Sequence, residues 1–206
     1  MVQPRKDLWE SSSETAVPDV LCGCTPNCVV IHGVFDKDLG AGALYNDQTR
    51  GTRITIRGTV YDGGGNPLRD ALVEIWQADE SGHYNSPSET RGTADPNFLG
   101  WGRSPGDMDT GEFVFETIKP GQVPFKDGRL MAPHVTFWIV ARGINIGLHT
   151  RMYFPEEEQA NAIDPVLARI EHKNRIPTLI ATKEGDNTYR FDIRLQGDGE
   201  TVFFDI

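Results

Sequence analysis

The feature that most constrains the fold is a series of short β-strand patterns that begins at residue 53. In residues 53–62, Ile54, Ile56 and Val60 fall on one face of an alternating run. Similar runs, separated by turns rich in Gly and Pro, occupy 72–79, 112–121, 132–143, 147–154 and 188–206. The last of these holds two alternating runs around Gly-Asp-Gly and predicts a hairpin. About seven or eight short strands predict an all-β fold, a β sandwich of mostly antiparallel strands.

The pattern divides the chain into two parts. Residues 1–50 show no period and predict a long irregular N-terminal arm, whose apolar content favours wrapping around the core or a partner chain. Residues 51–206 form the expected β-sandwich domain, in which 80–110 reads as loop. A short helix is expected at 164–172, with Asp164 as N-cap and Pro165 at the first helical position.

Charge and composition exclude several classes of protein. With 20 Lys and Arg against 30 Asp and Glu, the formal net charge is −10, which argues against a nucleic-acid or anionic-membrane partner. No apolar run approaches the roughly 20 residues of a membrane span. The first residues have no apolar stretch like that of a signal peptide, so a cytoplasmic location is expected.

Three cysteines lie close together, at Cys22, Cys24 and Cys28. Their spacing lacks the paired C-x2-C knuckles of a structural zinc site, although His32 could act as a fourth ligand. In a cytoplasmic chain, reduced cysteines acting as small apolar side chains are the simpler interpretation.

Several motifs, in the same order, resemble those of the intradiol ring-cleavage dioxygenases. They are DALVEIWQADESGHYNSP (70–87), TIKPGQVPF (117–125), APHVTFWI (132–139), ARGINIGLHTRMYF (141–154), DPVLARI (164–170) and YRFDIRLQGDGETVFFDI (189–206). The likeness covers roughly residues 10–206 and is closest to the alpha chains of two-chain members. It implies a β-sandwich core and a hetero-oligomer of repeated alpha–beta pairs. It also implies O2-dependent opening of 3,4-dihydroxybenzoate to 3-carboxy-cis,cis-muconate, with Fe(III) held by the beta chain.

The resemblance also implies that this chain holds no cofactor of its own. The family site uses two tyrosinates and two histidines, the latter as H-x-H on a strand, so that both reach one metal ion. Carried onto this sequence, the four positions are Tyr84, Val123, His134 and Thr136. Neither Val nor Thr is a plausible ligand for Fe(III), so Tyr84 and His134 are expected to be remnants of a vestigial site without catalytic residues.

Two other interpretations of Tyr84 and His134 stay open. A lone His on an apolar strand is usually a hydrogen-bonded core residue, and a Tyr after Gly-His is usually a packing aromatic. Alternatively, the two could form a new metal site together with His83 or His149.

The resemblance also points to residues that could line a partner's substrate pocket. The Arg of the A-R-G-I-N-I motif is Arg142, and a guanidinium suits the ring carboxylate of the substrate. The family's N-terminal S-Q-T-A-G-P-Y corresponds to SETAVPD at 13–19, where Thr15 and Pro18 match. Val17 replaces Gly and Asp19 replaces Tyr, so the arm could run differently here.

Two further residues carry weaker expectations. Trp76 lies in an apolar strand pattern and is expected in the core. Arg151 could meet an acidic partner residue, although solvation on a strand face is the simpler expectation.

These observations leave three hypotheses about the function of the chain. The first is an alpha subunit that is inactive without a beta subunit, and the second is a self-sufficient dioxygenase with altered ligands. The third is a binding or scaffold protein on a β sandwich with no role in catalysis. Replacing Arg142 by Ala separates the first from the third, because only a residue at the pocket changes the KM of an assembled enzyme.

Overall fold

The computed structural model describes residues 40 and 42–205. Its strands are β1 (Arg53–Tyr61), β2 (Leu72–Trp76), β3 (Trp101–Pro105), β4 (Glu112–Ile118), β5 (His134–Val140), β6 (Leu148–Tyr153), β7 (Thr182–Lys183), β8 (Thr188–Arg190) and β9 (Ile193–Arg194). Helical segments are α1 (Glu158–Ile163) and two 3-10 stretches, η2 (Leu167–Arg169) and η3 (Lys173–Leu179). None of the helices in the described part of the chain has the length and apolar character needed to cross a membrane.

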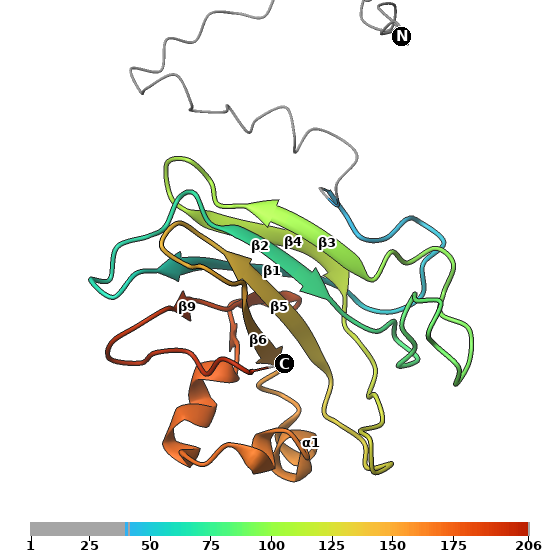
Figure 1. The fold of residues 1–206 in the computed structure, drawn as a ribbon. Helices are drawn as coiled ribbons and strands as arrows, with labels where there is room; N and C mark the ends of the chain where they lie inside the picture. The colour runs from blue at the N-terminus through green and yellow to red at the C-terminus, as the bar shows by residue number, and fades with distance from the viewer. Residues whose placement is uncertain (1–39, 41, 206) are drawn as a thin grey trace, which may run out of the picture. The chain divides into compact units, whose positions relative to one another are not determined.

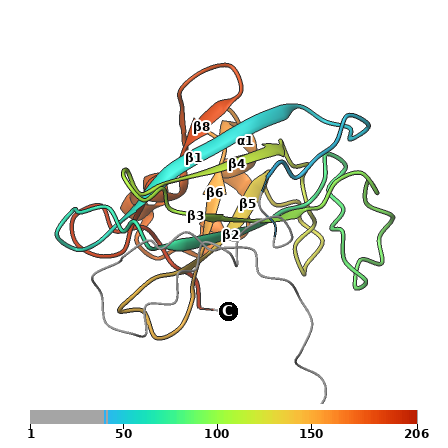
Figure 2. The same cartoon turned by 90° about the horizontal axis from the view of Figure 1, so that it is seen from above.

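The strands form two sheets, as the sandwich prediction requires. One has the order β4-β1-β8-β7, with β9 also paired to β1, and the other has the order β3-β2-β5-β6. Figures 1 and 2 show these layers stacked face to face, with the helical segment below them in the view of Figure 1. All pairs of the second sheet are antiparallel, whereas β8 and β9 run parallel to β1.

The core lies between the inner faces of the sheets. Along β5, Val135, Phe137 and Ile139 alternate toward the core and are fully buried. The Phe137 ring lies 5.9 Å from Phe113 of β4 and 5.1 Å from Phe191, across the interior. Burial of side chains of this size contributes roughly 1.5–3 kcal/mol each. The residues that alternate with them, His134, Thr136 and Trp138, therefore point to the outer face of the second sheet.

One expectation about the strands was wrong, and another holds only in part. Residues 80–110, expected to be loop, contain β3, which pairs with β2 from Leu72–Pro105 to Trp76–Trp101. Its sequence WGRSP has no apolar alternation because β3 is an edge strand and only Gly102 in it is buried. The C-terminal run turns back around Gly-Asp-Gly, where the Thr201 N–H donates to the Arg194 carbonyl at 3.0 Å, but among the described residues its two halves form no ladder beyond this turn. Instead Phe204 pairs with His149 of β6, and the Phe204 N–H donates to the His149 carbonyl at 2.8 Å.

The helix expected at 164–172 was also misplaced. The α-helix ends before Pro165, because a residue that precedes proline is driven to the extended conformation, and Asp164 has φ −61° and ψ 126°. Pro165 therefore lies just after the end of α1, and it also stands at the first position of the short helical turn that follows, where the Ala168 N–H donates to the Asp164 carbonyl at 3.0 Å. The Asp164 carboxylate does act as a cap, since it accepts the backbone N–H groups of Val166 and Leu167, both at 2.8 Å. The structure after it is the three-residue turn η2.

Part of the region named as an arm packs on the sandwich. Leu44 is 1% exposed, its N–H donates to the Glu116 carbonyl, and its own carbonyl accepts the Leu99 N–H. The remaining sites assigned to the arm lie outside the described residues, namely Thr15, Val17, Pro18, Asp19, Cys22, Cys24, Cys28 and His32. The division at residue 50 stays an expectation.

Candidate functional site

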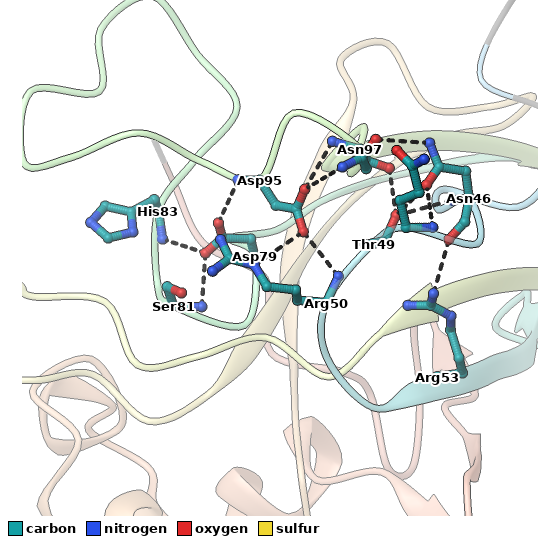
Figure 3. Close-up of polar contacts among 10 residues, drawn as sticks. Asn46, Thr49, Arg50, Arg53, Asp79, Ser81, His83, Asp95 and Asn97 are labelled. Atoms are coloured by element: carbon teal, nitrogen blue, oxygen red, sulfur yellow. Dashed lines mark hydrogen bonds and ion pairs between the residues drawn. The ribbon is translucent and has the colours of Figure 1, made fainter.

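The loop that carries Tyr84 is held by one buried carboxylate. Asp79 is 2% exposed, and its Oδ1 accepts the N–H groups of Ser81 and His83, each at 2.9 Å. Its Oδ2 accepts the N–H of Asp95 at 2.8 Å, which ties the loop to the segment before β3 (Figure 3). Asp95 in turn accepts the Arg50 N–H at 2.9 Å. A carboxylate accepting several backbone donors makes the strong, charge-assisted kind of hydrogen bond.

A close backbone contact brings this loop against the segment after β4. Gly82 has φ +79°, and a Cβ placed there would lie 2.1 Å from the Gln122 carbonyl oxygen. The Gly121 N–H donates to the Asp79 carbonyl at 2.8 Å. Both glycines let two backbones touch where a side chain would keep them apart. As a result, Tyr84 and Val123, which are distant in the sequence, lie in the same apolar cluster.

Tyr84 packs in a small apolar cluster. Val123 is 5% exposed and groups with Ala78 and Met131, and Tyr84 is half-buried against them. Its ring stacks on Trp76 with centroids 6.1 Å apart and an interplanar angle of 15°. Beside this pair lies a cavity of about 340 Å³. Its lining residues are Trp76, Tyr84, Ser86, Ser88, Glu89, Thr90, Arg91, Val123 and Pro124.

The expectation that Trp76 is a core residue was wrong. Its side chain is 39% exposed, whereas Val73 and Ile75 of the same strand are buried. The two-residue period of a strand places Trp76 on the outer face, opposite to the face that Val73 and Ile75 pack into the core. The apolar run in the sequence of β2 therefore reflects an outer face that is partly covered by other side chains, and not a strand that is buried on both faces.

His134 is buried and neutral. It is 3% exposed, its Nδ1 lies 2.8 Å from the Ala132 carbonyl oxygen, and its Nε2 has no hydrogen-bond partner in the described part of the chain. Burial, assisted by the positive charge of Arg151, lowers the pKa of His134 to about 4. The packing interpretation is thus supported at one ring nitrogen, while the other is left without a partner.

Tyr84 is also in its neutral form. Burial raises the pKa of Tyr84, and the guanidinium groups of Arg151 and Arg91 lower it by a smaller amount. Trp76, on which the Tyr84 ring stacks, pairs across the sheet with Thr136, and Thr136 pairs on its other side with Arg151. One phenol, one imidazole, a Val and a Thr do not fit a mononuclear iron site. Within residues 42–205, no group of three or more His, Cys, Asp or Glu side chains could hold a metal ion.

The two additional histidines are not placed to complete a site with His134. His149 lies opposite Trp138 in the β5–β6 register, whereas His134 lies opposite Tyr153, about 13 Å further along the sheet. The His83 ring packs against Gly92, where a Cβ would lie 2.5 Å from Nε2. The structure therefore offers no support for a new metal site built from these residues.

Arg142 occupies a different place from the other candidates. His134 begins β5 and Arg142 follows its end, so they lie at opposite ends of a strand about 20 Å long. The Arg142 side chain is 77% exposed, and its Nε lies 3.2 Å from Asp70 Oδ2. It borders a cavity of about 430 Å³, which is lined by Asn66, Pro67, Arg69, Asp70, Met108 and Arg142. Arg142 thus faces outward, away from the cluster around Tyr84.

Sequence reasoning missed three residues that shape these sites. Asp79 was detectable from Asp-x-x-Gly, a turn in which the Asp side chain accepts nearby N–H groups. Asp164 was recognised only as a cap, yet its buried carboxylate also accepts the Ala132 N–H at 2.8 Å, next to His134. Arg151 was treated as solvated, and no local pattern shows that it lies across the sheet from Thr136.

The family model and the relatives in sequence that this chain matches are dioxygenases. The family model described as dioxygenase matches residues 30–197. The protocatechuate 3,4-dioxygenase alpha chain of Pseudomonas putida is 48% identical over 205 residues, covering 98% of this chain and 99% of that protein. The protocatechuate 3,4-dioxygenase beta chain of Burkholderia cepacia is 37% identical over 179 residues, covering 82% of this chain and 75% of that protein. 

A solved structure supports the same fold. The 3-chlorocatechol 1,2-dioxygenase of Rhodococcus opacus 1CP superposes with a TM-score of 0.59 at 24% identity, over 76% of this chain and 65% of that one. At this identity the likeness concerns the fold alone.

Proposed function

The chain belongs to the family of intradiol ring-cleavage dioxygenases, and on that premise we propose that it is the non-iron alpha subunit of a protocatechuate 3,4-dioxygenase. Enzymes of this family depend on non-haem iron. The proposal assigns the Fe(III) to a beta subunit and gives this chain a supporting part in O2-dependent cleavage of 3,4-dihydroxybenzoate. A cytoplasmic location is part of the same proposal and rests on the sequence.

The observation that carries the proposal is the composition of the cluster around Tyr84. Of the four positions that correspond to iron ligands, Val123 is packed among apolar side chains and Thr136 lies on the outer sheet face beside Arg151. The remaining pair, Tyr84 and His134, supplies one phenol and one imidazole. Two side chains are too few to hold Fe(III), for which this family uses two tyrosinates and two histidines. Turnover therefore needs iron from another chain.

A beta subunit is the natural source of that iron. Both alpha and beta chains of protocatechuate 3,4-dioxygenases are similar to this chain, as expected for two subunits built on one fold. We infer a hetero-oligomer of repeated alpha–beta pairs.

Arg142 is the residue of this chain that we assign to the substrate. Its guanidinium is exposed, borders a cavity and lies at the end of β5 that is remote from the vestigial cluster. In that position it is free to contribute to a pocket that another chain completes. A guanidinium binds a carboxylate through two parallel hydrogen bonds, which suits the ring carboxylate of 3,4-dihydroxybenzoate. Thr15 and Pro18 are proposed as further contacts from the N-terminal segment, on the strength of the motif alone.

The deciding experiment measures iron content and ring-cleavage rate of this chain alone and after mixing with a beta chain. We expect no iron in the isolated chain and activity only in the mixture. In the mixture, R142A should raise the KM for 3,4-dihydroxybenzoate about tenfold or more, as expected for the loss of a charge-assisted pair, with unchanged assembly. R57Q, on the other sheet, is the control, because Arg57 pairs with Glu184 and does not line the cavity.

Other outcomes would each select a different function. Stoichiometric iron and turnover in the isolated chain would make it a self-sufficient dioxygenase. Normal assembly with unchanged kinetics in R142A would leave this chain a scaffold without a part in substrate binding.

A further inference from the structure

The outer face of the second sheet carries a positively charged side chain, Arg151, beside the vestigial cluster. We use this name for the four former ligand positions, Tyr84, Val123, His134 and Thr136. Thr136 lies at the middle of three paired positions, with Trp76 of β2 on one side and Arg151 of β6 on the other. Side chains that face each other across antiparallel strands have Cβ atoms about 4.5–5.5 Å apart. The Arg151 side chain therefore starts next to the position where a second histidine ligand would stand.

The guanidinium of Arg151 reaches from there into the cluster. Its Nη1 lies 3.4 Å from the sulfur of Met131, which is 6% exposed and packs with Val123 and Ala78. Its positive charge acts on both Tyr84 and His134, the two surviving ligand positions. One guanidinium thus lies against Met131 of the cluster and close enough to Tyr84 and His134 to act on both.

Arg151 is not paired directly with a carboxylate in the described part of the chain. Among residues 42–205, the ion pairs join other arginines and lysines to acids, and none involves Arg151. Its guanidinium carbon lies 5.9 Å from the ring centroid of Phe204, and the guanidinium also contacts the Tyr153 hydroxyl, which is 3.4 Å from Oδ1 of the buried Asp164. A guanidinium without a direct acidic partner repels a metal ion that approaches the same ligands.

We propose that Arg151 takes the place of the metal in this cluster and excludes cations from it, independently of the two ligands that are missing. This inference rests on the proposed function, because it takes Tyr84, Val123, His134 and Thr136 as the former ligand positions. It goes further than the proposed function, because it states that restoring the two missing ligands does not by itself restore iron binding. The Arg151 guanidinium supplies a fixed positive charge near the remaining phenol and imidazole, where a metal ion would otherwise stand.

The test restores the ligands with and without the cation. The double variant V123Y/T136H supplies the missing phenol and imidazole, and V123Y/T136H/R151Q also removes the charge. Each full-length chain is incubated with Fe(III), freed of excess metal and measured for bound iron by mass spectrometry. The visible absorption of an Fe(III)–tyrosinate bond is the second measurement. We expect less than about a tenth of an equivalent of iron in the double variant and close to one equivalent in the triple variant.

Two controls separate charge from packing. V123Y/T136H/R151K keeps the charge and should stay free of iron, and V123Y/T136H/R57Q removes a distant arginine and should match the double variant. Thermal melting checks that each variant is folded, and R151M replaces R151Q if the triple variant is not.

The outcomes distinguish this inference from the function it rests on. Equal iron in the double and triple variants, or none in a folded triple variant, would overturn it while leaving the proposed function intact. Stoichiometric iron in the wild-type chain would overturn the proposed function itself.

Discussion

The Nε of Arg142 lies 3.2 Å from the Oδ2 of Asp70, and both residues line the cavity that we assign to the substrate carboxylate. Asp70 comes from the turn before β2, and Arg142 from the loop after β5. The pair is open to water, with side-chain exposures of 47% for Asp70 and 77% for Arg142. Asp70 is therefore a weak internal competitor for the guanidinium.

Removing that competitor should favour the substrate. In the assembled enzyme we expect D70N to lower the KM for 3,4-dihydroxybenzoate by up to about fivefold, since exposed ion pairs contribute about 0–1 kcal/mol. The rate constant kcat should not change, and the effect should shrink at high salt. Steady-state kinetics at two ionic strengths check this, with D127N as control, because Asp127 pairs with the exposed Arg129 instead. A higher KM in D70N would show that Asp70 positions Arg142 rather than competing for it.

Gly82 is expected to tolerate no side chain. G82A combines a positive φ with a Cβ that would lie 2.1 Å from the Gln122 carbonyl oxygen. G65A is the matched control, because Gly65 has the same φ of +79° with no atom within 4 Å of the added carbon. G65A should cost about 1–2 kcal/mol of unfolding free energy from the backbone alone, and G82A should cost more. Urea unfolding of both variants measures the difference, and equal losses would contradict the close contact.

The Asp164 carboxylate should be essential for the packing of the helical segment on the sheet. It is fully buried, and its two oxygens accept the N–H groups of Ala132, Val166 and Leu167. D164N turns one acceptor into a donor that faces an N–H group, so we expect a loss of about 1–3 kcal/mol. D107N is the control, because Asp107 accepts the N–H groups of Asp109 and Thr110 while exposed to water. A loss in D164N no greater than that in D107N would argue against this role.

His134 should make the chain less stable in acid. Its pKa is about 4 in the folded protein and about 6.5 when the chain is unfolded, so the unfolded chain takes up the proton first as the pH falls. Stability contributed by neutral His134 is complete above pH 6.5 and falls as the pH drops toward 4. Between pH 7.5 and pH 5 we expect a loss of about 2 kcal/mol from this residue.

The measurement compares urea unfolding of wild type and H134Q at both pH values. H134Q should lose about 2 kcal/mol less than wild type between them, whatever its own stability. H172Q serves as control, because His172 is exposed. An identical pH dependence in wild type and H134Q would show that His134 is not buried in neutral form.

The parts of the fold that depend on local pattern were predictable. β1, β4, β5 and β6 follow the apolar runs seen in the sequence, because alternation of period two directly reports which face is buried. β3 escaped detection, because an edge strand with a single buried glycine has little apolar signal. The helix after β6 was misplaced because Pro165 can either start a helix or end the one before it.

The sequence by itself determined most of the strand pattern and the family, and it carries the proposal that two ligand positions are lost, because each depends on residue identity and spacing. Only the tertiary structure decided where the surviving groups lie. Trp76 faces outward, Arg151 enters the space beside Thr136, and Arg142 stands at the far end of β5. These placements follow from strand register and from backbone contacts such as that of Gly82 with Gln122. Register and contact join residues distant in the chain, and no local pattern encodes them.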